Sequence, residues 1–460
     1  MQLDTADAAR SGALRLPVAR PALGLDAAVR SRAGQLALIL VFALGVRLLW
    51  VFVTGWEPTP DDDAFRYDFA ARALAEGRGY VHLDGTPTAF WPPGYPLLLT
   101  AAYVLFGESV QTAQLANVAL GTATVALVYL IGRRTLGANA GLIGAAIVAA
   151  FPSLVFFTGV TLSEIAFTFL ALLGVYLLIV EAQSERPLDL RLLLAAGLVL
   201  GLASLVRGQA LLLPLVLVPF WLRSGVDWPL IGRRLVAIAL GLGLIVAPWT
   251  VRNAVQMDAP VLIATNAGVD FWIGHHDNAT GDFGTFGSNE LVYRYPELTP
   301  TEREVRVNSD GFREGLTYAV THPAQELALP FKKLFYLYYN DEEGLKWNEG
   351  HGGQSFLSAP AREALLSLSN VYYFAVLGLA VLGLPLWASR RDPGRLLLVS
   401  LVAYWTVIHL VFFADPRFHA PIMPIAALFA ALPLATLWSN GREGAPVLRP
   451  RAGATLPTSH

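Results

Sequence analysis

The chain has 460 residues, of which 55% are hydrophobic and only 15% are charged. This composition indicates a protein that crosses a membrane many times rather than a string of soluble domains. The formal net charge of −2 gives no general basic field for nucleic acid, and the lack of cysteine excludes disulfide bonds and thiolate chemistry.

The chain begins with an arginine-bearing tail and a first apolar run, residues 35–54. This order is also that of a secretory signal peptide, but the apolar core of a signal peptide has only about 7 to 15 residues. The run reaches the length of about 20 residues that a membrane span needs, and no small-residue cleavage site follows it. We therefore expect a retained first helix behind a disordered cytoplasmic tail, residues 1–33.

Further apolar runs predict an α-helical polytopic membrane protein with about ten or more transmembrane helices and a small extracytoplasmic domain. One short run, residues 96–106, cannot cross alone and is expected to lie at the membrane interface. The longer runs lie near residues 109–131, 138–157, 163–181, 190–206, 209–222, 235–251, 367–388, 396–413 and 421–438.

The runs also divide the chain into domains. We expect an N-terminal transmembrane catalytic module (34–251) with a first outer loop (55–108), an extracytoplasmic soluble segment (252–366), C-terminal transmembrane helices (367–438) and a cytoplasmic tail (439–460). The soluble segment is Gly-rich at first, and its second half is charged and is expected to be helical over residues 300–339.

Arginines in alternate short loops fix the predicted orientation. By the positive-inside rule, we expect these loops and the N-terminus to be cytoplasmic, in a multi-pass protein of the plasma (inner) membrane. The unusual polar residues then all share the extracytoplasmic face, as one common site requires. The cytoplasmic arginines are Arg133, Arg134, Arg186, Arg191, Arg223, Arg233, Arg234, Arg390, Arg391 and Arg395.

Three consecutive acids, Asp61, Asp62 and Asp63, open an amphipathic run in the first outer loop. One of them can serve as the cap of a helix, because a carboxylate there accepts backbone N–H groups. Capping needs only one acid, whereas ionisable groups at a membrane site usually have a function. We therefore expect at least one of the three to act in chemistry.

Glu164 opens an apolar run in the second outer loop. It could start the helix together with Ser163 or extend its carboxylate to the interface, but the run is otherwise free of charge, which favours a functional role.

Positive residues reach the same face from later loops. Arg207 stands between two apolar runs, and Asp415, Arg417 and His419 lie in the turn "ADPRFHAP". The alternatives are an interfacial anchor for Arg207 and a local ion pair for Asp415 with Arg417. A guanidinium group also matches the oxygens of a phosphate, so these arginines predict a phosphate-binding cavity.

Aromatic and histidine residues complete the candidates. Trp91, in "FWPPGYP", is either part of an interfacial aromatic belt or a platform for a sugar. His275 and His276 are adjacent and point apart, which makes them a poor metal pair, and no motif has metal-ligand spacing. No nucleotide-binding motif is present either.

An ordered series of motifs runs through the chain: "DAFRYDFAARALAEGRGY", "AFWPPGYPLLLTAAYVLFG", "AQLANVALGTATVALVYLIGRRTLG", "FPSLVFFTGVTLSEIAFTFLALLGVYLL", "GLASLVRGQALLLPL" and "DPRFHAPIMPIAALFAA". This series resembles the bacterial membrane glycosyltransferases of the GT-C fold. Within that fold, it looks like the branch related to protein O-mannosyltransferases and lipid A aminoarabinose transferases. The resemblance extends from the first helix to the last and is thinnest in the outer segment.

The resemblance implies transfer of a sugar from a polyprenyl-phosphate donor, with inversion, to an extracytoplasmic acceptor that is a lipid, a glycan or a protein. In that family an acid followed three and four residues later by a basic residue and a tyrosine is essential. Asp63 with Arg66 and Tyr67 fits, Asp62 is a possible substitute, and Glu164 matches an acid of the second outer loop.

The resulting scheme has Asp63 as the general base for the acceptor hydroxyl. Arg207, Arg417 or Arg66 would stabilise the leaving phosphate. The scheme requires no metal, although clustered acids could bind a divalent ion. A transporter or flippase for a lipid-linked or polar solute is the alternative, but it predicts two related halves with interrupted helices, which the sequence does not contain.

Overall fold

The computed structural model describes residues 31–60, 62–184, 188–284, 290–349, 355–388 and 393–438. These ranges are helical, and the one β-pairing within them is an isolated bridge between Val81 and Pro87. Most of the two predicted tails and Asp61 lie outside the described residues.

Within the described ranges, seven helical segments are long and apolar enough to cross a membrane, and a pair bent by 61° makes an eighth if it is one span. The bent pair is α6 (Ala138–Ala149) with α7 (Pro152–Phe156) and η1 (Phe157–Gly159). The seven are α2 (Arg32–Thr54), α5 (Val110–Thr135), α8 (Glu164–Ala182), α11 (Trp228–Gln256), α17 (Ala359–Ala388), α18 (Pro393–Val411), and η3 (Pro416–Ile422) continued by α19 (Met423–Trp438).

The prediction of about ten or more spans slightly exceeds the seven or eight that the described ranges show. The two runs at 190–206 and 209–222 form α9 (Leu190–Val206), then η2 (Gly208–Val216) with α10 (Leu217–Arg223), and both are too short to pass the length criterion. Arg207 lies between the two pieces, and its extended backbone ends α9. Pro214 lies inside the second piece, in η2.

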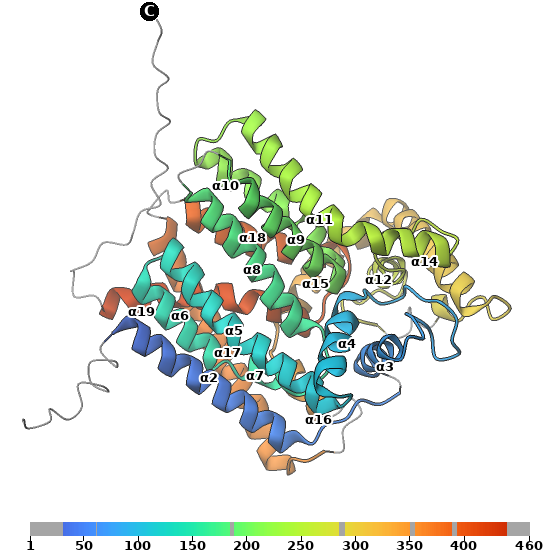
Figure 1. Ribbon diagram of the computed structural model, residues 1–460, viewed down its shortest axis with the longest axis horizontal. Helices are drawn as coiled ribbons and strands as arrows, with labels where there is room; N and C mark the ends of the chain where they lie inside the picture. Colours follow the sequence, from blue (N-terminus) through green and yellow to red (C-terminus); the bar gives the residue numbers. More distant parts are fainter. Residues whose placement is uncertain are drawn as a thin grey trace, which may run out of the picture.

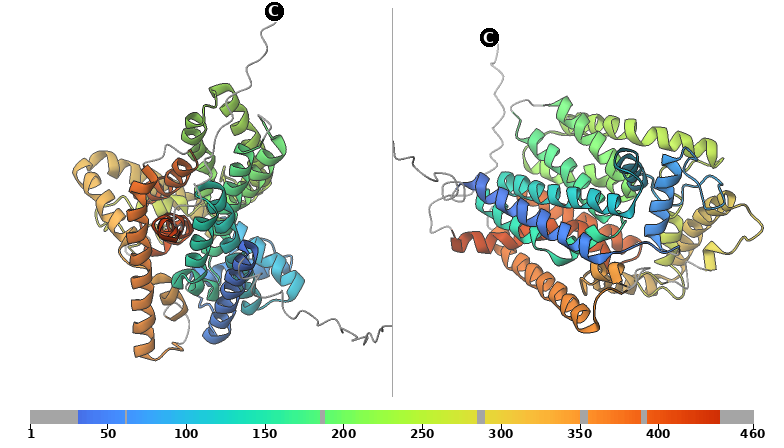
Figure 2. Two further views of the ribbon diagram at one scale, coloured as in Figure 1. Left: turned by 90° about the vertical axis from the view of Figure 1, so that its left-hand side faces the viewer. Right: turned by 60° about the horizontal axis from the view of Figure 1, so that its bottom comes forward.

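The long helices lie side by side, and the polar elements gather at one end of them (Figures 1 and 2). α9 packs against α8 and α11, while α19 packs against α6 and α17. The elements at that end are α3 (Asp63–Ala75), α4 (Gly94–Phe106), α12 (Ala267–Ile273), α14 (Pro300–Thr321) and α16 (Glu343–Glu349). α15 (Pro323–Tyr338) follows α14 and packs against α18 and η3.

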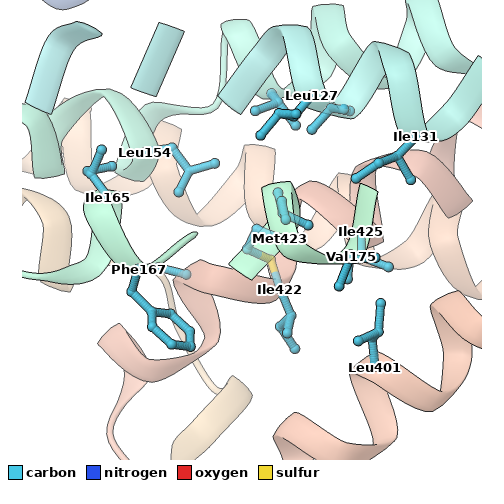
Figure 3. Packing of buried hydrophobic residues seen from close by; sticks show 14 of the residues in the cluster. Leu127, Ile131, Leu154, Ile165, Phe167, Val175, Leu401, Ile422, Met423 and Ile425 are labelled. Carbon is cyan, nitrogen blue, oxygen red and sulfur yellow. The ribbon is translucent and has the colours of Figure 1, made fainter. Parts of the chain in front are cut away.

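The largest buried cluster lies between the spans (Figure 3). Leu127 of α5, Phe167 of α8, Leu401 of α18 and Ile425 of α19 belong to it. The outward sides of the spans are apolar too, as Val41 and Phe52 of α2 show. Apolar residues inside and outside are what a helix bundle surrounded by lipid requires.

The predicted helix over 300–339 is two helices. α14 starts at Thr299, whose side chain caps the backbone N–H of Glu302, while the Glu302 carboxylate accepts the N–H of Thr299 in return. α14 ends before Pro323, which begins α15. The break follows from proline chemistry, because the residue before a proline disfavours the helical conformation.

Candidate functional site

Of the three consecutive acids, the structure describes Asp62 and Asp63, and these two side chains make different contacts. Asp62 is the N-cap of α3: its Oδ1 accepts the N–H of Phe65 at 2.6 Å, and its Oδ2 accepts from the backbone and hydroxyl of Thr59. Burial raises the pKa of Asp62, and these hydrogen bonds oppose the rise. Because Asp62 satisfies the helix start, Asp63 is not needed as a cap.

Asp63 is the first residue of α3 and meets two residues that are distant in sequence. Its Oδ2 accepts from the Nη1 and Nη2 atoms of Arg417 at 3.1 and 3.2 Å. Its Oδ1 accepts from the indole Nε1 of Trp91 at 3.3 Å. The Asp63 side chain is 33% exposed, so the carboxylate remains open to a ligand.

Arg417 lies in η3, and Asp415 caps that helix by accepting the N–H of Arg417 at 2.8 Å. The guanidinium lies 5.2 Å from the ring centroids of both Trp347 and Phe418. Its Nε is buried and has no hydrogen-bond partner among the described residues. One N–H of this arginine is therefore available to an added acceptor. Burial raises the pKa of Asp415, while the positive charge of Arg417 opposes the rise.

A second acid–arginine pair lies deeper. Glu164, the first residue of α8, accepts from Nη2 of Arg207 at 2.5 Å, and the Nε of Arg207 donates to Ser163 at 3.0 Å. Glu164 is only 1% exposed. Phe418 joins the two pairs, since its ring centroid is 5.8 Å from the Arg207 guanidinium as well.

Arg66 and Tyr67 line the same region from α3. The Arg66 guanidinium lies 5.9 Å from the ring of Trp91. Tyr67 is buried edge-on against Tyr95, with ring centroids 5.4 Å apart. Burial raises the pKa of Tyr67, and the charge of Asp63 adds to the rise, so the phenol remains protonated.

The loop that carries Trp91 is fixed by the outer segment. Glu304 of α14 accepts from the Thr88 hydroxyl and from the N–H of Ala89, both at 2.7 Å. Just beyond the loop, a Cβ at Gly94 would lie 2.5 Å from the backbone of Val206. Only glycine allows α4 to start this close to the end of α9, which Arg207 caps.

His419 has a different position from the other candidates. It is fully buried, with Nδ1 2.8 Å from the carbonyl oxygen of Leu337 and Nε2 3.0 Å from Oδ1 of Asp341. These contacts tie η3 to α15 and to the residues that follow it. His419 therefore holds the helix that carries Arg417.

Two residues of the site were missed by sequence reasoning. Asp270 of α12 lies in the electrostatic field of Asp63, Arg417 and Arg207; burial and the charge of Asp63 raise its pKa to about 7, and the arginines oppose this. Its carboxylate accepts from the side-chain amide of Asn266 at 3.0 Å. Trp347 of α16 is the other. An acid inside the apolar stretch "GVDFWIG" was a usable signal for Asp270, whereas none marked Trp347.

Throughout the ranges described above, no three His, Asp or Glu side chains converge in a group that could hold a metal ion. His275 lies against Glu326, 2.9 Å away, and His276 stacks on Trp272.

Comparison with known proteins places this geometry in a wider context. A family model described as dolichyl-phosphate-mannose-protein mannosyltransferase matches residues 91–251, a range that includes Trp91, Glu164 and Arg207. A comparison with curated protein sequences finds no match.

Solved structures show a related fold. The archaeal oligosaccharyltransferase AglB from Archaeoglobus fulgidus, in complex with an inhibitory peptide and a dolichol-phosphate, matches with a TM-score of 0.53 and 14% identity. The match covers 88% of this chain and 50% of that one. The apo form of the same oligosaccharyltransferase has a TM-score of 0.55, again at 14% identity and with the same coverage of both chains.

ArnT from Cupriavidus metallidurans, bound to undecaprenyl phosphate, is a more distant match, with a TM-score of 0.46 at 16% identity over 88% of this chain and 77% of that one. The chain thus spans about half the length of the oligosaccharyltransferases it matches. The likeness to the oligosaccharyltransferase structures confirms the predicted fold class: the chain is a polytopic helical membrane protein with a GT-C-like fold.

Proposed function

We propose that this chain is an inverting membrane glycosyltransferase that moves a sugar from a polyprenyl-phosphate donor to a hydroxyl group on the extracytoplasmic side. The contact between Asp63 and Arg417 carries the proposal, because it joins a carboxylate and a guanidinium that are 354 residues apart. The mannosyltransferase family match and the GT-C-like fold support the same class of reaction.

Arg417 is the proposed contact for the donor phosphate. Its Nε lacks a partner among the described residues, and its two Nη atoms donate to a carboxylate that is partly exposed. A phosphate presents the same kind of oxygen acceptors with more charge, so it can replace the carboxylate. Donor binding would then release Asp63 from Arg417.

The released carboxylate is the proposed general base, with Asp62 retained as its alternative. As the acceptor oxygen forms its bond to the anomeric carbon, Asp63 takes the proton from that oxygen. The bond between the anomeric carbon and the phosphate oxygen breaks on the opposite side, and its electron pair leaves with the phosphate. Arg417 and Arg207 stabilise this charge, and the attack inverts the anomeric centre.

The remaining candidates have supporting roles in this scheme. Glu164 holds Arg207 in place, and Asp415 and His419 hold η3. Trp91, with Arg66 behind it, offers an aromatic face to the sugar. Asp270 and Asn266 come from the outer segment and are placed to accept hydrogen bonds from an acceptor that arrives from water.

The proposed location is the plasma (inner) membrane, with the N-terminus in the cytoplasm and the site facing outward. Support comes from Arg133 and Arg134, which lie in the last turn of α5, whereas Asn117 near the start of that helix bonds to Tyr95 of α4. By the positive-inside rule, the end that carries the two arginines is cytoplasmic. The acceptor is proposed as a lipid, a glycan or a protein.

The experiment that tests the proposal is transfer of labelled sugar from polyprenyl-phosphate donors in membranes that contain the purified chain and native envelope acceptors. Wild type should transfer label, and Asp63→Asn should not, while Asp62→Asn should keep activity in proportion to its folded fraction. If no donor supports transfer but the chain moves the donor across the bilayer, the transporter alternative replaces the proposal.

A further inference from the structure

Helix α15 has two different faces. Its buried residues Leu329, Lys333 and Leu337 point toward α18 and η3, against which the helix packs. Its other face exposes large apolar side chains: Leu327 is 74% exposed and Phe331 is 76% exposed. These residues and Phe335 are spaced four apart, so they form one stripe along the helix, with Leu334 beside it.

A stripe of this kind is not expected on a domain surrounded by water. Large apolar patches on soluble proteins mark surfaces that another molecule or a membrane covers. Hydropathy alone did not reveal a membrane element here, because Glu326, Lys332 and Lys333 interrupt the apolar sequence. The identity of the covering medium follows from the depth at which the helix ends.

The C-terminal end of α15 is hydrogen-bonded to two spanning helices, α18 and α17. The hydroxyls of Tyr338 and Thr406 are 2.7 Å apart, and Thr406 lies about 7.5 Å along α18 from its end at Val411. The Tyr373 hydroxyl donates to the Tyr338 carbonyl at 3.1 Å. Since Tyr373 lies about 21 Å along α17 from its first residue, the end of α15 lies within the length of both spans.

The neighbouring surfaces of those spans are themselves apolar and exposed. Val407 and Val411 of α18 point outward near the bond to Tyr338, and Val371 and Phe374 of α17 flank Tyr373. Acyl chains that cover these residues reach α15 as well. Lys332 borders the stripe, where its long side chain can extend toward the headgroups.

We propose that α15 is embedded in the leaflet on the side of the site, with Leu327, Phe331 and Phe335 facing lipid acyl chains. This places the helix in the membrane rather than in the soluble segment that the sequence predicted. The carbonyl of Leu337 lies 2.8 Å from His419, so a lipid-embedded helix supports η3 and thereby Arg417. The proposal does not depend on the proposed transferase activity.

The absence of cysteine makes a direct test possible, because each introduced cysteine is unique. Phe331→Cys and Phe335→Cys would carry a nitroxide label in the full chain reconstituted in phospholipid nanodiscs. Collision with oxygen, which concentrates in lipid, is compared with collision with a water-soluble nickel chelate. Val407→Cys on α18 is the lipid reference, and Glu302→Cys at the start of α14 is the water reference.

The proposal predicts that both α15 labels have an oxygen-to-nickel collision ratio equal to that of the Val407 label and several-fold above that of the Glu302 label. A ratio equal to that of the Glu302 label would place the face in water and overturn the proposal. Low collision with both reagents would also overturn it, because the stripe would then be covered by protein, such as a second copy of the chain.

Discussion

The two acid–arginine pairs at the site have the same chemistry but different surroundings. Glu164 and Arg207 lie at the ends of two packed helices, and the carboxylate is almost completely buried. Asp63 and Arg417 meet between α3 and η3, and the carboxylate is about one-third exposed. The first pair is built into the scaffold, whereas the second can exchange partners with a ligand.

This difference separates stability from activity. Removing one partner of a buried pair leaves an uncompensated charge, at a cost of about 3–5 kcal/mol. Breaking a surface pair costs about 1 kcal/mol or less. The outer pair lies between these limits, since Asp63 is 33% exposed and Arg417 16% exposed, so its loss should cost less than that of the inner pair. Substitutions in the inner pair should therefore act mainly by destabilising the protein, and substitutions in the outer pair should act mainly by lowering the activity of a folded protein.

Asp63→Asn should have the largest effect on transfer. The amide cannot take the acceptor proton, so we expect a loss of about 10²- to 10⁴-fold in the rate of sugar transfer. The thermal unfolding temperature should change little, because Asp63 is partly exposed. The distinction between the two acid–arginine pairs is wrong if this variant unfolds or if it transfers sugar at the wild-type rate.

Arg207→Gln should have the largest effect on stability. The change leaves the buried Glu164 without its counter-ion, and we expect a loss of about 3–5 kcal/mol in the free energy of unfolding. Denaturant titration of the purified chain in detergent measures it. The double variant Glu164→Gln with Arg207→Gln should recover part of the loss, since no buried charge then remains; a double variant no more stable than the single one would argue against a charge effect.

Arg417→Lys should have an intermediate effect, and the property that changes should be binding of the donor. Lysine keeps the charge but cannot donate two parallel hydrogen bonds, so KM for the polyprenyl-phosphate donor should rise about tenfold. Arg66→Lys is the matched control, because Arg66 makes its contact with the face of Trp91. An equal rise in both variants would place the phosphate elsewhere.

The smallest effect concerns Asp270, whose pKa is raised from 3.8 to about 7 by burial and by Asp63. A raised acid pKa means that the folded chain holds a proton that the unfolded chain releases. The stabilisation is complete below pH 4, declines as the pH rises and is lost above pH 7. Wild type should melt a few degrees lower at pH 8 than at pH 6, and Asp270→Asn should reduce that difference; an unchanged difference would contradict the placement.

The fold class and much of the candidate site could be predicted from the sequence because charges at the ends of apolar runs are conspicuous. Asp63, Glu164, Arg207 and Arg417 all stand out in this way, and the structure brings them together. The sequence could not indicate which acid pairs with which arginine, because that depends on how α3 packs beside η3.

Other features depended on tertiary structure. Asp270 comes within the electrostatic influence of Asp63 and Arg417 only through the position of α12, which packs against α14. Trp347 lies beside Arg417 through the position of α16. The predicted number of spans exceeds the number shown because the runs on either side of Arg207 form helices too short to meet the length criterion. Composition located the break at Arg207, but it did not show that neither piece is long enough to cross alone.

The central claim is that the donor phosphate takes Arg417 from Asp63, and the affinity of purified chain for polyprenyl phosphate tests it most directly. Quenching of tryptophan fluorescence can report binding, since Trp347 lies against Arg417. Asp63→Asn should bind the phosphate more tightly than wild type, because its amide competes less for the guanidinium. Weaker binding by Asp63→Asn would contradict the exchange of partners.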